Sequence, residues 1–396
     1  MPKRPVQGSI TVLTLFLVLF LGVADNQVLS PLLPAIRAQF GRNSAELALV
    51  FTGYSIAAAL SVLFWGPLSD RLGSKRGLLA GLAVFGCGSA VSSLSRTYGT
   101  LVLARVITGT GASMLSLNAI SYAAAAFPYR KRGRAMGSIV SSYFAALILG
   151  VPAGSWIGDR FGWSTVFTFI LAGSCLLWLA VFLLLTSFPG ADPQADKRPR
   201  QGEALRIYLG FTQNGETLGA LLSALFASAG AVGFLAFLGV WLHDAFRLSA
   251  REIGLVFLAS GAAALVASPL AGALYDRIGK RVQFIASSGA LAFLLLLLPA
   301  LEWGWFLFLA FGAISMAAAF RQGPLEALIT EVISPARRGS FLALRNAFSQ
   351  LGIALSASAG GLLFQAHGYW AVCLLGCAAN LAAALLMAML VSRKHL

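Results

Sequence analysis

Charge is scarce in this chain, and acid is scarcer than base. Charged residues make up 11% of the 396 residues, whereas a soluble domain normally carries about 25%. The chain holds 14 Asp and Glu against 29 Lys and Arg, and 58% of its residues are hydrophobic. This composition excludes an ordinary soluble protein and indicates an integral membrane protein.

The residues that serve most catalytic and metal sites are also scarce. The sequence has three His and four Cys, and all four Cys lie within apolar runs, where we expect them to pack against neighbouring side chains. It contains no phosphate-binding glycine loop, no cluster of metal ligands and no nucleophile triad. These absences argue against an enzyme and against an ATP-driven pump, and we expect no metal and no other cofactor.

The apolar runs are about 20 residues long, which favours membrane-spanning helices over the short strands of a barrel. We predict an all-α membrane protein with twelve transmembrane helices in two pseudo-symmetric halves, residues 1–187 and 217–396. A linker rich in proline and charge, residues 188–216, joins the halves. The predicted helices cover roughly residues 10–36, 46–67, 77–94, 99–126, 135–158, 164–187, 217–242, 251–274, 282–301, 304–330, 340–365 and 370–391.

Lys and Arg are unevenly distributed among the predicted loops. If the N-terminus lies inside, inner segments hold 20 of them, outer segments hold six, and three lie within the spans. By the positive-inside rule, both termini and the linker are predicted to lie in the cytoplasm, with the chain in a bacterial cytoplasmic membrane. Anionic lipid headgroups then balance the basic loops, so we expect no nucleic-acid partner.

A short charged string occurs once in each half, ending in the basic pairs Lys75-Arg76 and Lys280-Arg281. Four identities inside one short window make a chance match improbable, so the string indicates that the two halves arose by duplication. The matched residues are 206 positions apart and are Gly66 and Gly272, Asp70 and Asp276, Arg71 and Arg277, and Gly73 and Gly279.

The same offset pairs each aspartate with a helix start in the other half. Asp70 is matched with the start of the span 340–365 near Gly339, and Asp276 with the start of the span 135–158 near Gly133. A carboxylate at a helix N-terminus is stabilised by about 0.3–1 kcal/mol. We therefore interpret the repeated string, including Arg76 and Arg281, as a two-sided inner gate; the alternative is a solvated turn that only sets topology.

These residues resemble the major facilitator superfamily across nearly the whole chain. The repeated string resembles its best-known loop motif, and Leu103–Ala112 resembles its motif in the fourth helix. Leu149–Trp163 and the stretch from Asp25 to Ile36 resemble the proton-coupled drug and sugar-efflux antiporters within it. One departure is Ser164, which stands where that motif often has an arginine.

The resemblance implies a secondary transporter that exports a small amphipathic organic compound, a drug or a sugar, in exchange for protons by alternating access. Its partners would be the solute, protons and the lipid bilayer, and we expect a monomer. Alternatives are proton-linked uptake or facilitated diffusion of a metabolite, a lipid flippase, and a membrane sensor without transport activity.

Small residues recur at a spacing of four in the span 135–158. Gly150, Gly154 and Gly158 share one helix face, with Pro152 between them. This spacing predicts close approach of another helix and a kink at the proline. The antiporter resemblance implies that the bend also seals the interface between the halves.

Ionisable residues inside a membrane cost about 2.5–3.5 kcal/mol each by insertion scales, so each is a candidate for function. Asp25 is the first candidate for proton coupling; the alternative is a structural ion pair with Arg105. The resemblance implies a role in proton transfer for Arg105. Glu326 is the second candidate proton carrier, and Gly323-Pro324 beside it predicts a broken or kinked helix.

Polar and aromatic residues in the spans are candidates for lining a substrate cavity. The predicted substrate-binding residues are Asn26, Gln27, Tyr54, Asn118, Tyr143, Trp241, Arg321 and Gln322. Further candidates for the cavity are Tyr122, Phe237, Asn346 and Gln350.

Overall fold

The computed structural model describes residues 5–187, 201–332 and 338–390, and in these ranges it consists of helices and connecting loops. Twelve of the described helical segments are long and apolar enough to cross a membrane, which confirms the predicted fold class. The apolar runs form helices because hydrocarbon offers no partner for a free backbone N–H or C=O group.

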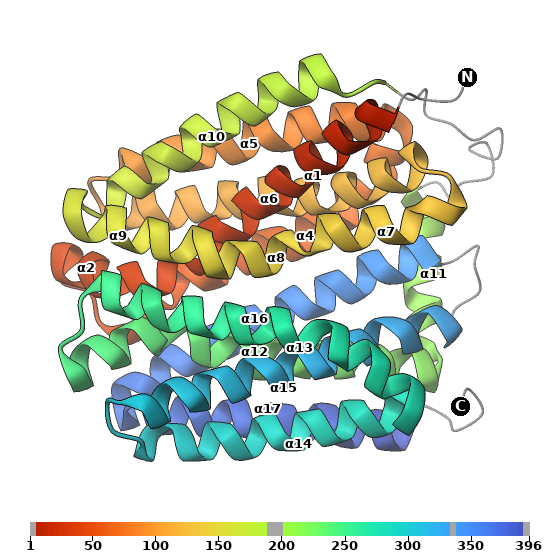
Figure 1. The fold of residues 1–396 in the computed structure, drawn as a ribbon. Helices are drawn as coiled ribbons and strands as arrows, with labels where there is room; N and C mark the ends of the chain where they lie inside the picture. The colour runs from red at the N-terminus through yellow and green to blue at the C-terminus, as the bar shows by residue number, and fades with distance from the viewer. Residues whose placement is uncertain (1–4, 188–200, 333–337, 391–396) are drawn as a thin grey trace.

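The two halves of the sequence form two separate groups of helices, the first half in the upper part of Figure 1 and the second half in the lower part. The first half contains α1 (Pro5–Gln27), α2 (Leu29–Phe40), α3 (Ser44–Leu47), α4 (Leu49–Leu72), α5 (Ser74–Ser93), α6 (Tyr98–Ala126), α7 (Tyr129–Val140), α8 (Ser142–Ala145), the π-helical turn η1 (Ala146–Gly150), α9 (Val151–Phe161) and α10 (Trp163–Leu184). The predicted linker contains α11 (Gln201–Gln213). The second half contains α12 (Gly215–Phe246), α13 (Ala250–Ile278), α14 (Lys280–Leu297), the 3-10 turn η3 (Leu298–Ala300), α15 (Trp305–Val332), α16 (Arg338–His367) and α17 (Tyr369–Leu390).

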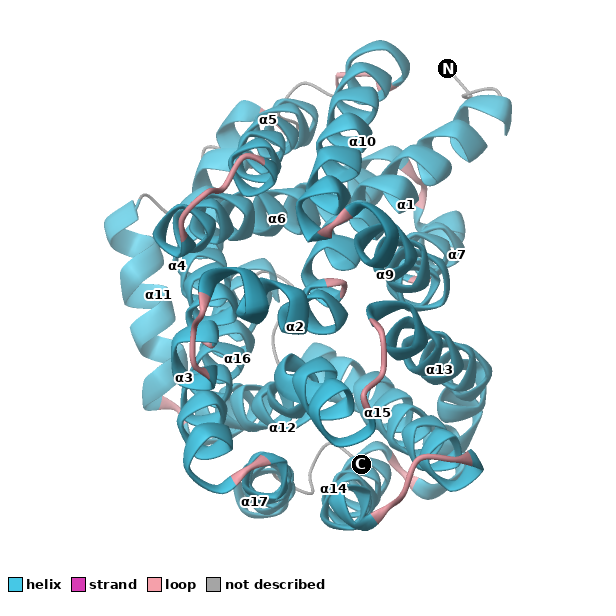
Figure 2. Ribbon diagram, turned by 90° about the vertical axis from the view of Figure 1, so that its left-hand side faces the viewer, coloured by secondary structure: helices cyan, strands magenta, loops and turns pink. Residues whose placement is uncertain are grey.

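The start of α1 and the end of α17 lie at the same end of the bundle, on the right in Figure 1. We call this end the terminal face and the other end the opposite face. Figure 2 looks at the opposite face, with α1, α5 and α10 in the upper part and α12, α14 and α17 in the lower part.

The duplication is visible in the backbone. Gly73 and Gly279 both have φ of 87°, a left-handed conformation that favours glycine over other residues. Lys75 Nζ donates to the carbonyl of Phe182 at 2.8 Å. The equivalent Arg281, 206 positions on, donates to the carbonyl of Ala388, which is equivalent to Phe182.

Two predicted helices differ from the observed ones. The span 10–36 is divided after Gln27 into α1 and α2, because Pro31 has no N–H to donate to the carbonyl of Gln27. Of the two forms predicted at Gly323-Pro324, a broken or a kinked helix, the break is excluded, since α15 runs through Pro324. Gln283 Nε2 donates at 2.9 Å to the carbonyl of Phe320, which is the group that Pro324 leaves without a donor.

Candidate functional site

A central cavity of ≈ 190 Å³ lies between the two halves. Helices α1, α4, α6 and α8 of the first half line it together with α12 and α16 of the second half. None of the described residues that line the cavity is charged, and their polar groups are amides and hydroxyls. These polar residues are Asn26, Gln27, Tyr54, Ser55, Ser113, Ser116, Tyr143, Asn346 and Gln350.

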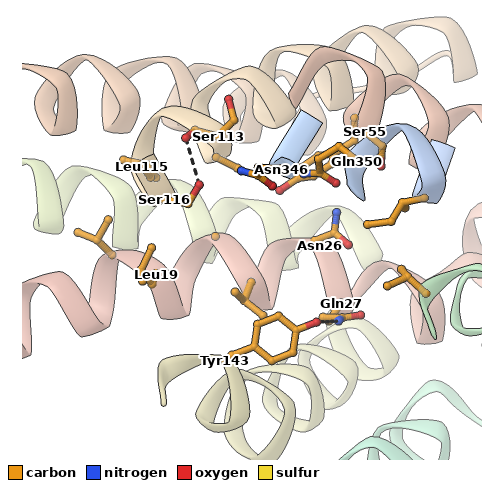
Figure 3. Close-up of a pocket in the computed structure, with 17 residues that line it drawn as sticks. Leu19, Asn26, Gln27, Ser55, Ser113, Leu115, Ser116, Tyr143, Asn346 and Gln350 are labelled. Carbon is orange, nitrogen blue, oxygen red and sulfur yellow. Dashed lines mark hydrogen bonds between the residues drawn. The ribbon is translucent and has the colours of Figure 1, made fainter. Parts of the chain in front are cut away.

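Figure 3 shows how the two halves share the cavity. Asn346 and Gln350 project from α16 toward the side of the cavity formed by Ser55 and Ser113. On another wall, Gln27 Nε2 donates to the hydroxyl of Tyr143 at 3.3 Å. Leucine, valine, isoleucine and alanine side chains and one glycine complete the lining. The cavity therefore offers neutral hydrogen-bonding groups on an apolar background.

A buried ion pair lies directly behind this cavity. Arg105 Nη1 donates to Asp25 Oδ2 at 2.8 Å, and both side chains are 0% exposed. The Arg105 guanidinium lies 4.7 Å from the centroid of the Tyr54 ring and 6.0 Å from that of Phe167. Because Tyr54 also lines the cavity, one aromatic side chain separates the ion pair from the cavity.

The ion pair is incompletely hydrogen-bonded. Asp25 Oδ1 and the Nε and Nη2 atoms of Arg105 have no hydrogen-bond partner among the described residues. Most buried polar atoms are paired, so three free atoms in one contact require an explanation. The contact itself confirms one expectation from the sequence, an ion pair between Asp25 and Arg105. A role of either residue in proton transfer stays a prediction. The geometry leaves Oδ1 available to a proton while Oδ2 keeps its bond to Arg105.

Two candidates in the first half lie away from the cavity. Asn118 is 0% exposed and packs against Gly77 at the contact of α6 with α5, donating to the carbonyl of Met114 at 2.7 Å. The Tyr122 hydroxyl donates to the carbonyl of Thr186 at 2.9 Å. Asn118 packs α6 against α5, Tyr122 bonds to the segment that follows α10, and neither side chain lines the cavity.

Four candidates in the second half also lie outside the cavity lining. Trp241 stacks on Tyr369 with ring centroids 4.5 Å apart, and Phe237 is fully buried. Arg321 is 4% exposed and donates to the Asn380 side chain and to the carbonyl of Ala227. Gln322, its neighbour, is exposed.

The sequence analysis missed the serines of the cavity. Ser55, Ser113 and Ser116 line it, and Ser113 and Ser116 donate to carbonyls one turn back in their own helix. Serine commonly makes this local bond in apolar helices, so its presence in a span is a weak signal. Only the packing of α4 and α6 shows which serines lie at a cavity.

The two halves are joined at the opposite face. Arg37 in α2 forms a two-point ion pair with Asp244 in α12, with Nη1 donating to Oδ2 at 2.8 Å. The hydrogen bond to Asp244 raises the pKa of Arg37 further above its ordinary value. Ser30 Oγ donates to the carbonyl of Leu235 at 2.5 Å and accepts from the N–H of Gly239 at 3.2 Å.

A third contact lies nearby, where Thr52 Oγ1 and Ser358 Oγ are 2.8 Å apart. Together these hydrogen bonds join α2 and α4 of the first half to α12 and α16 of the second half. The cavity is therefore separated from the opposite face by directly bonded helices.

The predicted inner gate lies at the terminal face. The side chains of Gly66, Asp70, Arg71, Asp276 and Glu326 lie outside the described residues, so the docking of the aspartates stays a prediction. A Cβ atom added to Gly133 or Gly339, at the two predicted docking points, would meet no atom within 4 Å. Arg76 and Arg277 are exposed.

The close approach predicted for the small residues of the span 135–158 is confirmed. A Cβ atom on Gly150 would lie 2.8 Å from Ala24 Cβ, and one on Gly154 would lie 2.6 Å from Val28 Cγ2. Gly158 faces Leu32 in the same way. The predicted span 135–158 is irregular near the expected kink: it contains the π-helical turn η1, which ends two residues before Pro152. These contacts place the helix that carries Pro152 beside the segment that carries Asp25.

Comparison with known proteins agrees with this architecture. The family model described as Major Facilitator Superfamily matches residues 15–215 and 220–395. This chain belongs to the major facilitator superfamily. The match covers both halves, so membership rests on nearly the whole chain and not on one motif.

Relatives match this chain over most of its length or over part of it. A relative from Bacillus subtilis (strain 168), the uncharacterized MFS-type transporter YwfA, is 27% identical over 384 residues, which are 93% of this chain and 89% of that protein. The riboflavin transporter RibZ of Clostridioides difficile (strain 630) is 29% identical over 161 residues, 41% of this chain and 35% of RibZ. The superfamily consists of transporters, so the chain is a secondary transporter with many membrane-spanning helices.

Solved structures of the superfamily show the same fold at low sequence identity. A D-xylose-proton symporter superposes with a TM-score of 0.76 at 19% identity, covering 97% of this chain and 98% of that one. A bacterial homologue of the human lysosomal transporter Spinster, in an inward-facing and unoccupied conformation, gives 0.75 at 17% identity, covering 98% of this chain and 96% of that one.

Proposed function

We propose that this protein exports a small, neutral, amphipathic organic compound across a bacterial cytoplasmic membrane in exchange for protons. The observation that carries the proposal is the pairing of two sites: an uncharged cavity between the halves and a buried carboxylate with one free oxygen behind its Tyr54 wall. A cavity of amides and hydroxyls suits a solute that hydrogen-bonds without carrying charge. The proton then has its own carrier.

The proposed cycle uses Asp25 as the proton carrier. A proton binds Oδ1, which is the free oxygen, and the pair with Arg105 then loses its balance of charge. The guanidinium contacts Tyr54, so a change in the pair reaches the cavity wall through that ring. Binding of the proton can therefore lower the affinity for the solute, and binding of the solute can lower the affinity for the proton, although the two sites are separate. Exchange requires this mutual lowering of affinity.

For orientation we propose that the terminal face is cytoplasmic, as the distribution of basic residues favours. The exposed residues Arg76, Lys131, Arg134 and Arg277 belong to loops and helix ends of this face. With the opposite face bonded across the halves, the described conformation then has its cavity closed to the outside. The cavity is formed within one chain, so we propose a monomer as the working unit.

The function is tested in liposomes that contain the purified protein and a pH indicator. Labelled neutral amphiphiles, sugars and riboflavin are screened with the lumen made acidic or alkaline relative to the outside. Riboflavin is included because one relative is named a riboflavin transporter. Exchange predicts solute accumulation driven by an acidic lumen, with alkalinisation of the lumen during uptake. Accumulation driven by an alkaline lumen would instead support proton-linked uptake, and movement of neither kind would contradict proton coupling.

Asp25→Asn is the decisive variant. It should abolish accumulation driven by the proton gradient while leaving exchange of labelled for unlabelled solute measurable. Asp159→Asn is the matched control, because Asp159 is an exposed aspartate near the C-terminal end of α9. Gradient-driven accumulation at the wild-type level in Asp25→Asn would exclude Asp25 as the carrier and direct attention to Glu326.

A further inference from the structure

A second hollow lies on the outer surface of the first half, in the groove between α5 and α10. Its volume is ≈ 330 Å³, and it is lined by Leu82, Ala83, Gly86, Cys87, Ala90, Leu171, Ser174, Cys175 and Trp178. Figures 1 and 2 show α5 and α10 side by side at the edge of the bundle. Cys87 and Cys175 are exposed here, so the expectation that all cysteines pack inside is wrong for these two.

The groove exists because small residues line up on α5. Ala83, Cys87 and Ala90 recur at a spacing of three to four and therefore share one face of the helix. The Trp178 side chain, 38% exposed, lines the groove and stacks on Phe182 with ring centroids 5.5 Å apart. Both helices are candidate membrane spans, so this apolar groove opens toward lipid.

The duplicated half has larger side chains at three of the equivalent places. The positions equivalent to Cys87, Ala90 and Cys175, 206 residues on, hold large side chains. These are Phe293, Leu296 and Leu381, which are 61%, 50% and 45% exposed. The tryptophan is also particular to the first half, since Ala384 stands at the position equivalent to Trp178. The same backbone arrangement therefore carries different surface side chains in the two halves, small ones at Cys87, Ala90 and Cys175 and large ones at their equivalents.

The two halves also differ in one exposed arginine near the groove, Arg76. Lys75 and its equivalent Arg281 both bind carbonyls of the neighbouring helix, so they have the same structural role in each half. Arg76, in contrast, is exposed, and its equivalent is the apolar Val282. Arg76 is seven residues before Ala83, which is nearly two helical turns, so the arginine lies above the groove on the same helix face.

We propose that the groove between α5 and α10 binds one acyl chain of an anionic phospholipid whose phosphate contacts Arg76. The distance from Arg76 to Gly86 along the helix is about 15 Å, which is about the thickness of one hydrocarbon leaflet. A chain that starts at the phosphate therefore ends in the groove. A second copy of the protein is a poorer occupant, because a two-fold axis along the membrane normal would bring Arg76 of both copies to the same depth. The proposal does not depend on which solute is transported.

The test uses the full-length protein in nanodiscs of defined lipid. Phosphatidylglycerol brominated in its acyl chains is mixed into phosphatidylcholine, and in a second series the brominated lipid is phosphatidylcholine. The quenching assigned to Trp178 is the difference between the wild type and Trp178→Phe. We expect an apparent affinity of the groove for phosphatidylglycerol that is about three- to five-fold higher than for phosphatidylcholine.

Three variants decide the outcome. Arg76→Val, which copies the residue of the second half, should abolish the preference for phosphatidylglycerol. Cys87→Phe with Ala90→Leu, which copies the larger side chains of the second half, should abolish the preference for phosphatidylglycerol and lower the quenching of Trp178 by both lipids to that of the surrounding bilayer. Arg277→Val removes an exposed cation of the terminal face away from the groove and should leave the preference intact.

Equal quenching by the two lipids in the wild type, or an unchanged preference in Arg76→Val, would overturn the proposal. A bifunctional maleimide that joins two chains through Cys87 in high yield would overturn it in favour of a second copy. Arg76 is at the surface, so a folding defect is not expected in its variant, and an unchanged melting temperature checks this.

Discussion

The ion pair between Arg37 and Asp244 should bias the protein toward the conformation in which the opposite face is closed. It joins α2 to α12 by two hydrogen bonds, and its side chains are 28% and 40% exposed. Exposed ion pairs contribute about 0.2–1 kcal/mol, and two-point geometry favours the upper end. Removing about 1 kcal/mol corresponds to roughly a five-fold increase in the population open at the opposite face.

The substitution is Asp244→Asn, and the assay is double electron–electron resonance spectroscopy on a protein without the native cysteines. Spin labels at Arg96 and Glu302, exposed residues in loops of the opposite face on different halves, report opening as a longer distance. The fraction of the long-distance population should rise by about the five-fold factor in dilute buffer. It should rise less in about 1 M salt, where charges beyond ~3 Å are screened and the wild-type pair is already weakened.

Two controls separate the pair from a general loss of charge. Arg42→Gln breaks the ion pair of Arg42 with Glu46, which also lies at the opposite face but within one half, and it should leave the populations unchanged. The charge exchange Arg37→Asp with Asp244→Arg should restore the wild-type distribution. An unaltered distribution in Asp244→Asn, or an equal shift in Arg42→Gln, would refute the reasoning.

Three further predictions concern stability, measured as the melting temperature in detergent. Gly154→Ala should lower the melting temperature, because overpacking costs about 1–3 kcal/mol of stability. Gly137→Ala, whose Cβ meets nothing within 4 Å, should raise the melting temperature slightly. Equal effects of the two substitutions would contradict the close contact at Gly154. Gln283→Leu should cost about 1–3 kcal/mol, because it leaves the carbonyl freed by the proline of α15 unpaired, and a neutral result would show that this bond is dispensable. Arg105→Leu should cost about 3–5 kcal/mol, and adding Asp25→Leu should recover part of the loss; a double variant less stable than the single one would show that the pair is not the reason.

The helices and the duplication could be predicted from the sequence because both depend on local chemistry. A run of about 20 apolar residues must be helical in hydrocarbon, whatever surrounds it. The offset of 206 between Gly73 and Gly279 reappears as equal φ angles at both glycines. The division of the first helix was missed, although Pro31 was visible, because a proline can bend a helix or end it, and its neighbours decide which.

The candidate site was only partly predictable, because helix faces are hard to assign when almost every face is apolar. Asn118 and Ser113 lie little more than one turn apart in α6, yet Ser113 lines the cavity and Asn118 packs on Gly77. The pair of Asp25 with Arg105 was among the alternatives only because two opposite charges in hydrocarbon need each other.

The sequence by itself determined that this chain is a duplicated helical membrane protein with few intramembrane charges, since composition, run length and repeat offset are properties of the chain alone. The tertiary structure decided which of those residues meet. It placed an aspartate and an arginine 80 positions apart at 2.8 Å, joined the halves at the opposite face through Arg37 and Asp244, and left a groove between α5 and α10. The physical reason is that distance between residues on different helices depends on how side chains of both helices pack, and side-chain size at one contact is not encoded by the hydropathy of either helix.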